Sequence, residues 1–127
     1  MKETKKVLVV DDEVHILHVV SLKLRNAGYE VITAQDGQEA LEIAQVELPN
    51  LIITDFQMPH LSGLELCQRL KQHPATKDIP AIMLTARGFA LEDTAIASTG
   101  IKRCLHKPFS PRQVLLEAEE ILGAMAV

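Results

Sequence analysis

The sequence predicts an α/β fold in which helices cover both faces of one parallel sheet. Two observations predict it: five short apolar runs that each end at a turn signal, and amphipathic segments between them. Strands that alternate with helices over short connections favour parallel pairing. The 127 residues, 47% of them hydrophobic, suffice for one domain with a sizeable core. We therefore expect residues 1–127 to form a single (βα)5 domain.

Each expected strand is a run of apolar or β-branched residues, as is typical of strands buried on both faces of a sheet. The clearest of them ends at Asp55 and is followed by Gln57, Met58 and Pro59. The expected strands are residues 7–10, 29–34, 51–54, 81–84 and 101–105.

Four of the five segments that follow the strands carry clear helix signals. Capping-box spacing opens helices at Asp36, Ser62 and Ser110, the last with Pro at the first helical position. The first helix is expected to end with Gly28 at its C′ position. The helix expected between residues 87 and 100 has the poorest apolar pattern. Inward-facing positions are predicted at Ile16, Leu17, Val20, Leu24, Ala27, Ala40, Leu41, Ala44, Leu48, Gly63, Leu66, Cys67, Leu70, Val114, Leu115, Ala118, Ile121 and Leu122.

Composition excludes several functions. A net charge of −4 and 3% aromatic residues disfavour direct nucleic-acid binding. No apolar run approaches the ~20 residues of a membrane span, and we find no signal peptide. Cys67 and Cys104 lack metal or redox spacing, so we expect reduced thiols in a cytoplasmic protein.

Chemically useful side chains stand where four of the five strands end. They are Asp11, Asp12, Asp55, Thr85 and Lys107. The carboxyl ends of parallel strands share one edge of a sheet, which is where open α/β sheets place their ligands. Three carboxylates, one hydroxyl and one ammonium are therefore expected to converge.

This set of groups favours phosphoryl chemistry. Clustered carboxylates repel each other, and a hard cation such as Mg²⁺ or Mn²⁺ relieves that repulsion. Lys107 can pair with a phosphoryl oxygen, Thr85 can donate to another, and Asp55 can form an aspartyl-phosphate. Positioning and charge neutralisation then suffice for transfer.

Taken singly, each of these residues has a structural explanation. A lone Asp at a strand end is more often a turn or N-cap residue, and a lone Lys is usually a solvated charge. The coincidence of five such groups at one edge favours a shared role. His15 and His18 are three residues apart but have no third ligand. His106 adjoins Lys107 and is expected to point to the opposite side of its strand.

The chain resembles the receiver domain of two-component response regulators, the CheY-like family, over essentially its whole length. The resemblance rests on four motifs in the family's order and spacing: Asp11-Asp12, Asp55 with Met58-Pro59, Thr85-Ala86 and Lys107-Pro108-Phe109. It implies a flavodoxin-like, doubly wound parallel sheet with strand order 2-1-3-4-5.

The resemblance also implies a phosphorelay role. Asp55 would take a phosphoryl group from a sensor histidine kinase, a phosphotransfer protein or acetyl phosphate. Lys107 would pair with that group, Thr85 would move to hydrogen-bond it, and the Lys107–Pro108 bond would be cis. The change would switch the surface near the fourth helix, fifth strand and fifth helix. Such a protein promotes only its own phosphorylation and dephosphorylation, so it is not expected to be an enzyme.

A metal site follows from the same resemblance. Mg²⁺, or Mn²⁺ in its place, would be held by Asp12, Asp55 and the backbone carbonyl of Gln57, with Asp11 partly through water.

Two features depart from the family pattern. Cys104 stands where the family usually has an aromatic residue that moves together with the threonine. Lys102 and Arg103 stand where acidic residues often support dimerisation, which disfavours that dimer. The cognate kinase, the output, the oligomeric state and the phosphoryl lifetime are not specified by the sequence.

Other functions fit the residues less well. A phosphatase of haloacid-dehalogenase type places a second Asp two residues after its nucleophile, but Gln57 follows Asp55 and Glu13 follows Asp11 at that spacing. A nucleotide-binding domain would need a glycine-rich turn after a strand, which this chain lacks. A binding module without phosphorylation would not need all five residues.

Overall fold

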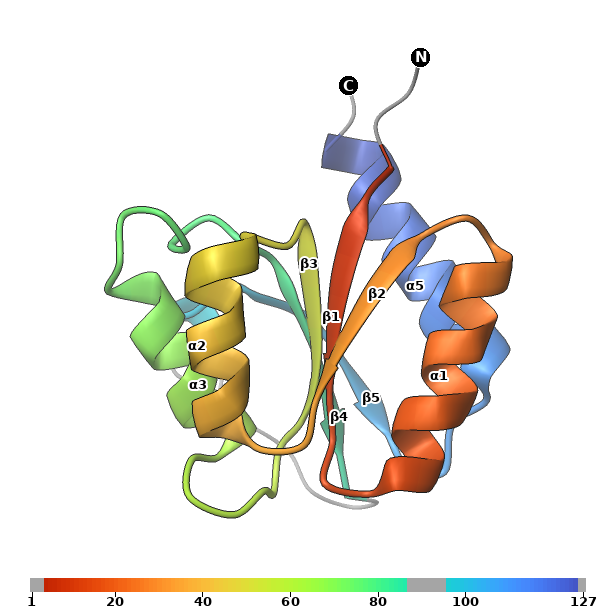
Figure 1. Ribbon diagram of the computed structural model, residues 1–127, viewed down its shortest axis with the longest axis horizontal. Helices are drawn as coiled ribbons and strands as arrows, with labels where there is room; N and C mark the ends of the chain where they lie inside the picture. The colour runs from red at the N-terminus through yellow and green to blue at the C-terminus, as the bar shows by residue number, and fades with distance from the viewer. Residues whose placement is uncertain (1–3, 87–95, 126–127) are drawn as a thin grey trace.

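Five parallel strands form the central sheet of the computed structural model, which describes residues 4–86 and 96–125 (Figure 1). The sheet order is β2-β1-β3-β4-β5, which confirms the flavodoxin-like topology. The strands are β1 (Lys6–Val10), β2 (Glu30–Ala34), β3 (Leu51–Asp55), β4 (Ala81–Thr85) and β5 (Ile101–His106).

Helices cover both faces of this sheet (Figure 1). One face carries α1 (Val14–Asn26) and α5 (Pro111–Met125), and the other carries α2 (Gly37–Glu47) and α3 (Gly63–Lys71). Most of the helix expected between residues 87 and 100 lies outside the described residues; of the predicted switching surface, β5 and α5 are described. Within the described ranges, no helix is long and apolar enough to span a membrane.

The strand pattern explains the two cores. Val7 and Val9 pack with α1 and α5, whereas Leu8 and Val10 pack with α2 and α3. Every residue of β3 is buried. Alternate side chains of a strand face opposite sides, so a strand covered on both faces is mostly apolar. Asp55, at the carboxyl end of β3, is the one charged residue of this strand, and it is buried as well.

The expected N-caps form. The Asp36 carboxylate accepts from the Glu39 N–H at 2.8 Å, and the Ser110 hydroxyl accepts from the backbone N–H three residues later at 3.1 Å. Ser62 makes a complete capping box. At Asp36 the box is modified, because the Glu39 carboxylate accepts from the N–H of Gln35 instead of that of Asp36.

Two predicted inward-facing residues are wrong, and both lie at helix ends. Ala27 caps α1 and is exposed, and Leu48 caps α2 in the left-handed region, with φ 48° and 49% exposure. Gly28 has φ 100°, and its N–H donates to the carbonyl of the second-last helical residue, as in a Schellman motif. The helical period no longer sets side-chain direction once the backbone leaves the helix.

Candidate functional site

Sheet hydrogen bonds continue past the strand ends and fix the backbone of the site. The Asp11 N–H donates to the Ala34 carbonyl at 3.2 Å, and the Lys107 N–H donates to the Thr85 carbonyl at 2.8 Å. Asp55 is the last residue of β3. Four of the predicted site residues, Asp11, Asp55, Thr85 and Lys107, are therefore held by the sheet itself, at its carboxyl edge.

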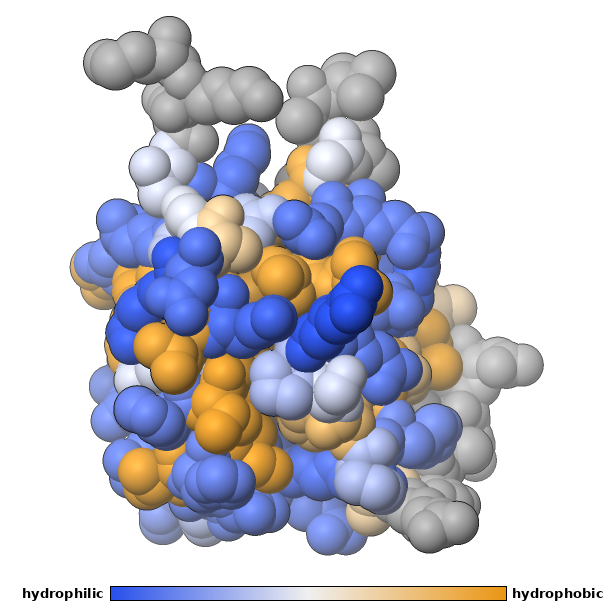
Figure 2. Space-filling view, turned by 90° about the vertical axis from the view of Figure 1, so that its right-hand side faces the viewer, coloured by the Kyte–Doolittle hydropathy of each residue, from blue (hydrophilic) through white to orange (hydrophobic). Residues whose placement is uncertain are grey.

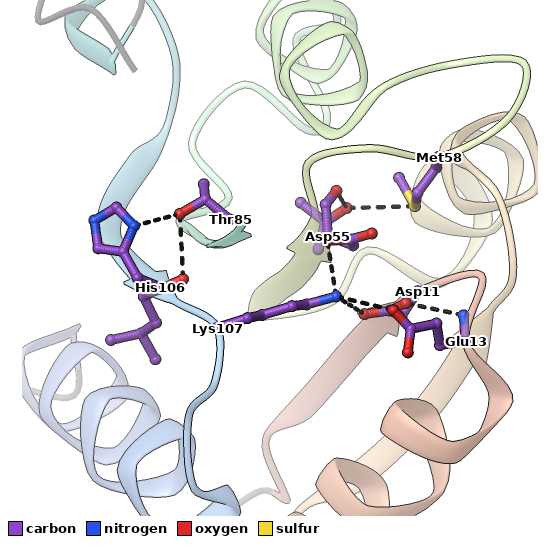
Figure 3. Close-up of polar contacts among 9 residues, drawn as sticks. Asp11, Glu13, Asp55, Met58, Thr85, His106 and Lys107 are labelled. Carbon is purple, nitrogen blue, oxygen red and sulfur yellow. Dashed lines mark hydrogen bonds and ion pairs between the residues drawn. The ribbon is translucent and has the colours of Figure 1, made fainter. Parts of the chain in front are cut away.

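Lys107 is the centre of the cluster (Figure 3). Its Nζ lies 3.2 Å from Asp55 Oδ1, 3.4 Å from Asp11 Oδ2 and 3.5 Å from Glu13 Oε1. The Asp11 side chain is 0% exposed and that of Asp55 is 9% exposed, whereas the Glu13 side chain is 59% exposed. One ammonium thus faces two buried carboxylates and one solvated carboxylate.

The buried carboxylates are held in an unfavourable environment. Burial raises the pKa of Asp11 to about 6, with a contribution from the Asp55 charge, against the opposing hydrogen bond from the Glu13 N–H. Burial also raises the pKa of Asp55, although the Lys107 charge opposes that rise. Burial would lower the pKa of Lys107, but Asp11 and Asp55 raise it above its ordinary value. Burial therefore disfavours the ionised form of both carboxylates more than the Lys107 charge favours it.

The carboxylates fit a hard divalent cation. Oxygen atoms of Asp11, Asp12 and Asp55 all lie within 4.8 Å of one another. Oxygen donors at this spacing are typical of Mg²⁺ sites, in which water fills the remaining positions. Among the residues that the structure describes, the potential metal-binding groups do not include His15 or His18. The predicted ligand Gln57 is exposed and lies two residues beyond Asp55 in the β3–α3 connection.

A glycine keeps that connection close to Asp55. The Gly63 N–H donates to the Phe56 carbonyl at 2.8 Å. A Cβ at residue 63 would lie 2.2 Å from the Asp55 carbonyl oxygen, far inside van der Waals contact. The start of α3 can therefore approach the end of β3 only where residue 63 lacks a side chain.

Thr85 lies at the same edge, but its hydroxyl is turned away from the cluster (Figure 3). The hydroxyl oxygen is 2.9 Å from His106 Nδ1 and 3.5 Å from the Leu105 carbonyl oxygen. His106 points away from Lys107, as the strand alternation predicts. The structure thus brings Asp11, Asp12, Asp55 and Lys107 together and leaves the Thr85 hydroxyl directed at β5.

The contact with His106 was not predicted, because it depends on strand register. Ala81 pairs with Ile101, but Ile82 pairs with Arg103, so the ladder passes over Lys102. Without that irregularity Thr85 would face Leu105; with it, Thr85 faces His106. The Glu13–Lys107 contact was also missed, since an acid in the first turn of a helix is common without any partner in the fold.

An apolar groove of about 650 Å³ adjoins the cluster and shares Glu13 and Lys107 with it. Its apolar walls come from α1 and from the segment that leads into α5: Ile16, Val19, Pro108, Phe109 and Pro111. Figure 2 shows apolar surface on the side of the molecule that α1 and α5 form. The Lys107–Pro108 bond that leads into this segment is cis, as the resemblance implied.

Comparison with known sequences identifies the family. The model of the response regulator receiver domain matches residues 7–119. The transcriptional regulatory protein PhoP of Bacillus subtilis is 42% identical over 118 residues, and the phosphate regulon regulator PhoB of Pseudomonas aeruginosa is 40% identical over 120. Each alignment covers 93% of this chain, but 48% and 52% of those proteins. The chain therefore spans about half the length of these curated relatives.

Solved structures of response regulators have the same fold as this chain. The chemotaxis response regulator CheY4 of Vibrio cholerae is 36% identical with a TM-score of 0.86, covering 94% of this chain and 99% of CheY4. A response regulator receiver domain protein of Clostridium thermocellum is 28% identical with a TM-score of 0.85, covering 96% and 97%. Because the family model covers most of the chain and CheY4 matches nearly all of it, this chain belongs to the response regulator receiver domains, the phosphoacceptors of two-component signalling.

Proposed function

We propose that Asp55 is the phosphoacceptor, and that its donor is the phosphohistidine of a sensor histidine kinase or of a phosphotransfer protein. The observation that carries this proposal is the 3.2 Å contact between Lys107 Nζ and Asp55 Oδ1 at the end of a buried strand. A P–O bond forms to Asp55 while the donor's P–N bond breaks, and the leaving imidazole nitrogen takes up a proton from water. Acetyl phosphate can serve in place of the protein donor.

Other residues of the site support Asp55 in this step. Lys107 holds the carboxylate and then faces the phosphoryl oxygens as a point charge. Asp11 and Asp12 would hold Mg²⁺, or Mn²⁺ in its place, together with Asp55 and the Gln57 carbonyl. The bound cation supplies positive charge that offsets the carboxylates and the transferring phosphoryl group. Thr85 donates its hydroxyl proton to a phosphoryl oxygen after it turns inward.

The proposal also includes the surface that the donor protein covers and the compartment in which the protein works. A donor protein that reaches Asp55 would cover the apolar groove, because that groove shares Lys107 with the site. We place the protein in the cytoplasm, which the free thiols of Cys67 and Cys104 support.

The domain is not proposed to turn over other substrates. The comparisons give no support to the haloacid-dehalogenase alternative.

Intact-mass measurement after incubation with acetyl phosphate and Mg²⁺ tests this proposal. We expect one added phosphoryl group on the wild type and none on Asp55→Asn. Asp78→Asn, which changes an exposed carboxylate outside the site, is the matched control and should be phosphorylated like the wild type. If the wild type gains nothing from acetyl phosphate or from a phosphorylated histidine kinase, Asp55 is not a phosphoacceptor.

A further inference from the structure

We propose that His106 is a positioning residue for Thr85: it holds the Thr85 hydroxyl toward β5 and so opposes the turn toward a phosphoryl group on Asp55. The inference rests on the proposed function of Asp55 and adds a control of the same site. It starts from the 2.9 Å separation between Thr85 Oγ1 and His106 Nδ1.

The Thr85 hydroxyl needs a partner inside the protein. Thr85 is 1% exposed, so water does not readily solvate its hydroxyl. The alternative acceptor, the Leu105 carbonyl oxygen, lies 3.5 Å away, at the outer limit of a hydrogen bond. A buried hydroxyl without a good partner is costly, so the contact with His106 stabilises the outward orientation.

A hydroxyl has one proton to donate, and this limits Thr85 to one acceptor at a time. When the imidazole proton is on Nε2, Nδ1 accepts from the Thr85 hydroxyl. The same proton cannot simultaneously reach a phosphoryl oxygen on Asp55. With this tautomer, engagement of the phosphoryl group requires that the bond to His106 be broken.

The end of β5 links both contacts. His106 and Lys107 are consecutive, and their side chains leave the strand in opposite directions (Figure 3). One reaches the Thr85 hydroxyl, and the other reaches Asp55. The Lys107 N–H also donates to the Thr85 carbonyl at 2.8 Å, which fixes the two strand ends relative to each other. His106 is exposed, so its ring can leave Thr85 without disturbing the core.

The test is the dissociation constant of beryllofluoride, a stable phosphoryl stand-in, measured with saturating Mg²⁺. Loss of one neutral hydrogen bond in the resting state should tighten binding roughly three- to tenfold in His106→Ala. His106→Asn places an amide oxygen near the position of Nδ1 and should restore wild-type affinity. His73→Ala, which removes an exposed histidine at the end of α3, is the matched control and should have no effect.

Thr85→Ala separates a positioning role from a general structural one. In that background His106→Ala should leave the affinity for beryllofluoride unchanged, since no hydroxyl remains to be held. An equal change in both backgrounds, or weaker binding by His106→Ala alone, would overturn the role of His106. If instead the wild type fails to bind beryllofluoride at all, the proposed function of Asp55 fails first.

Discussion

The two ends of the sheet each place a lysine between carboxylates, yet we propose a reactive site at only one of them. At the amino end, Lys6 Nζ lies 3.1 Å from Glu47 Oε1 and 3.6 Å from Glu30 Oε2. At the carboxyl end, Lys107 Nζ lies 3.2 Å from Asp55 and 3.4 Å from Asp11. The distances are alike, so distance does not distinguish the two clusters.

Burial and the balance of charge distinguish them. The side chains of Glu30 and Glu47 are 55% and 39% exposed, so water screens their charges. Asp11 and Asp55 are almost fully buried and share Lys107, and a carboxylate oxygen of Asp12 lies within 4.8 Å of an oxygen of each. The amino-end cluster therefore fastens α2 to β1, whereas the carboxyl-end cluster keeps negative charge that a cation can neutralise.

The largest expected difference between the ends concerns the two lysines. Lys107→Met should slow phosphoryl uptake from acetyl phosphate roughly 100-fold, because it removes the charge that faces the transferring group. Lys6→Met removes a similar set of contacts at the opposite end and should leave the rate unchanged. Time courses of intact mass measure both rates. Equal slowing by the two variants would mean that neither lysine acts at the transfer step.

The second expected difference between the two ends is the pH dependence of the unfolding free energy, and it is smaller than the effect of the lysine variants. The pKa of Asp11 is about 6 in the folded protein, against an ordinary value of 3.8. The folded state then binds a proton at Asp11 more tightly than the unfolded state, so the contribution of Asp11 to stability is greatest below about pH 4 and is lost as the pH rises through 6. Between about pH 5 and about pH 7.5, Asp11 alone should cost about 1.4 kcal/mol.

Urea denaturation of the metal-free protein at those two pH values checks this prediction. The asparagine in Asp11→Asn cannot ionise, so this variant should lose most of the difference in unfolding free energy between the two pH values. Glu30→Gln, at the amino end, should retain it, since the Glu30 side chain is 55% exposed. A wild type whose unfolding free energy does not fall between the two values would show that Asp11 is not held in an unfavourable state.

Local patterns in the sequence predicted the carboxyl-end cluster well. The apolar runs that become β1 and β3 lead into Asp11 and Asp55 in the structure as in the sequence, because burial on both faces favours uncharged residues along a strand and leaves charged groups to its ends. The parallel order then brings these ends to one edge. Neither inference needed a distance between remote residues.

Features that depend on register or on helix ends could not be read in this way. The partner of Thr85 is His106 because the β4–β5 ladder passes over Lys102, and no local pattern marks that irregularity. Leu48 continues the helical period of α2 but faces solvent, because the backbone has already left the helix there. Strand register depends on how two strands pair, and the direction of a side chain at a helix end depends on where the helix stops. The apolar pattern within one element determines neither.

The smallest predicted effect tests which carboxylates make up the cluster. Mg²⁺ at about five times its dissociation constant should raise the unfolding free energy by about 1 kcal/mol at neutral pH. Asp12→Asn should remove most of this gain, because its carboxylate is one of the three whose oxygens lie within 4.8 Å of one another. Asp12 is exposed, so its replacement should cost little stability without the metal, and the two effects can be separated by urea denaturation with and without Mg²⁺.

Glu13→Gln is the sharper control for that experiment. Glu13 contacts Lys107 at 3.5 Å, but it is not one of the three clustered carboxylates. If the cation is held by Asp11, Asp12 and Asp55, Glu13→Gln keeps the Mg²⁺ response. If the response is lost, binding of the cation depends on every carboxylate around Lys107. The total charge of the cluster, and not the geometry of three aspartates, would then determine Mg²⁺ binding.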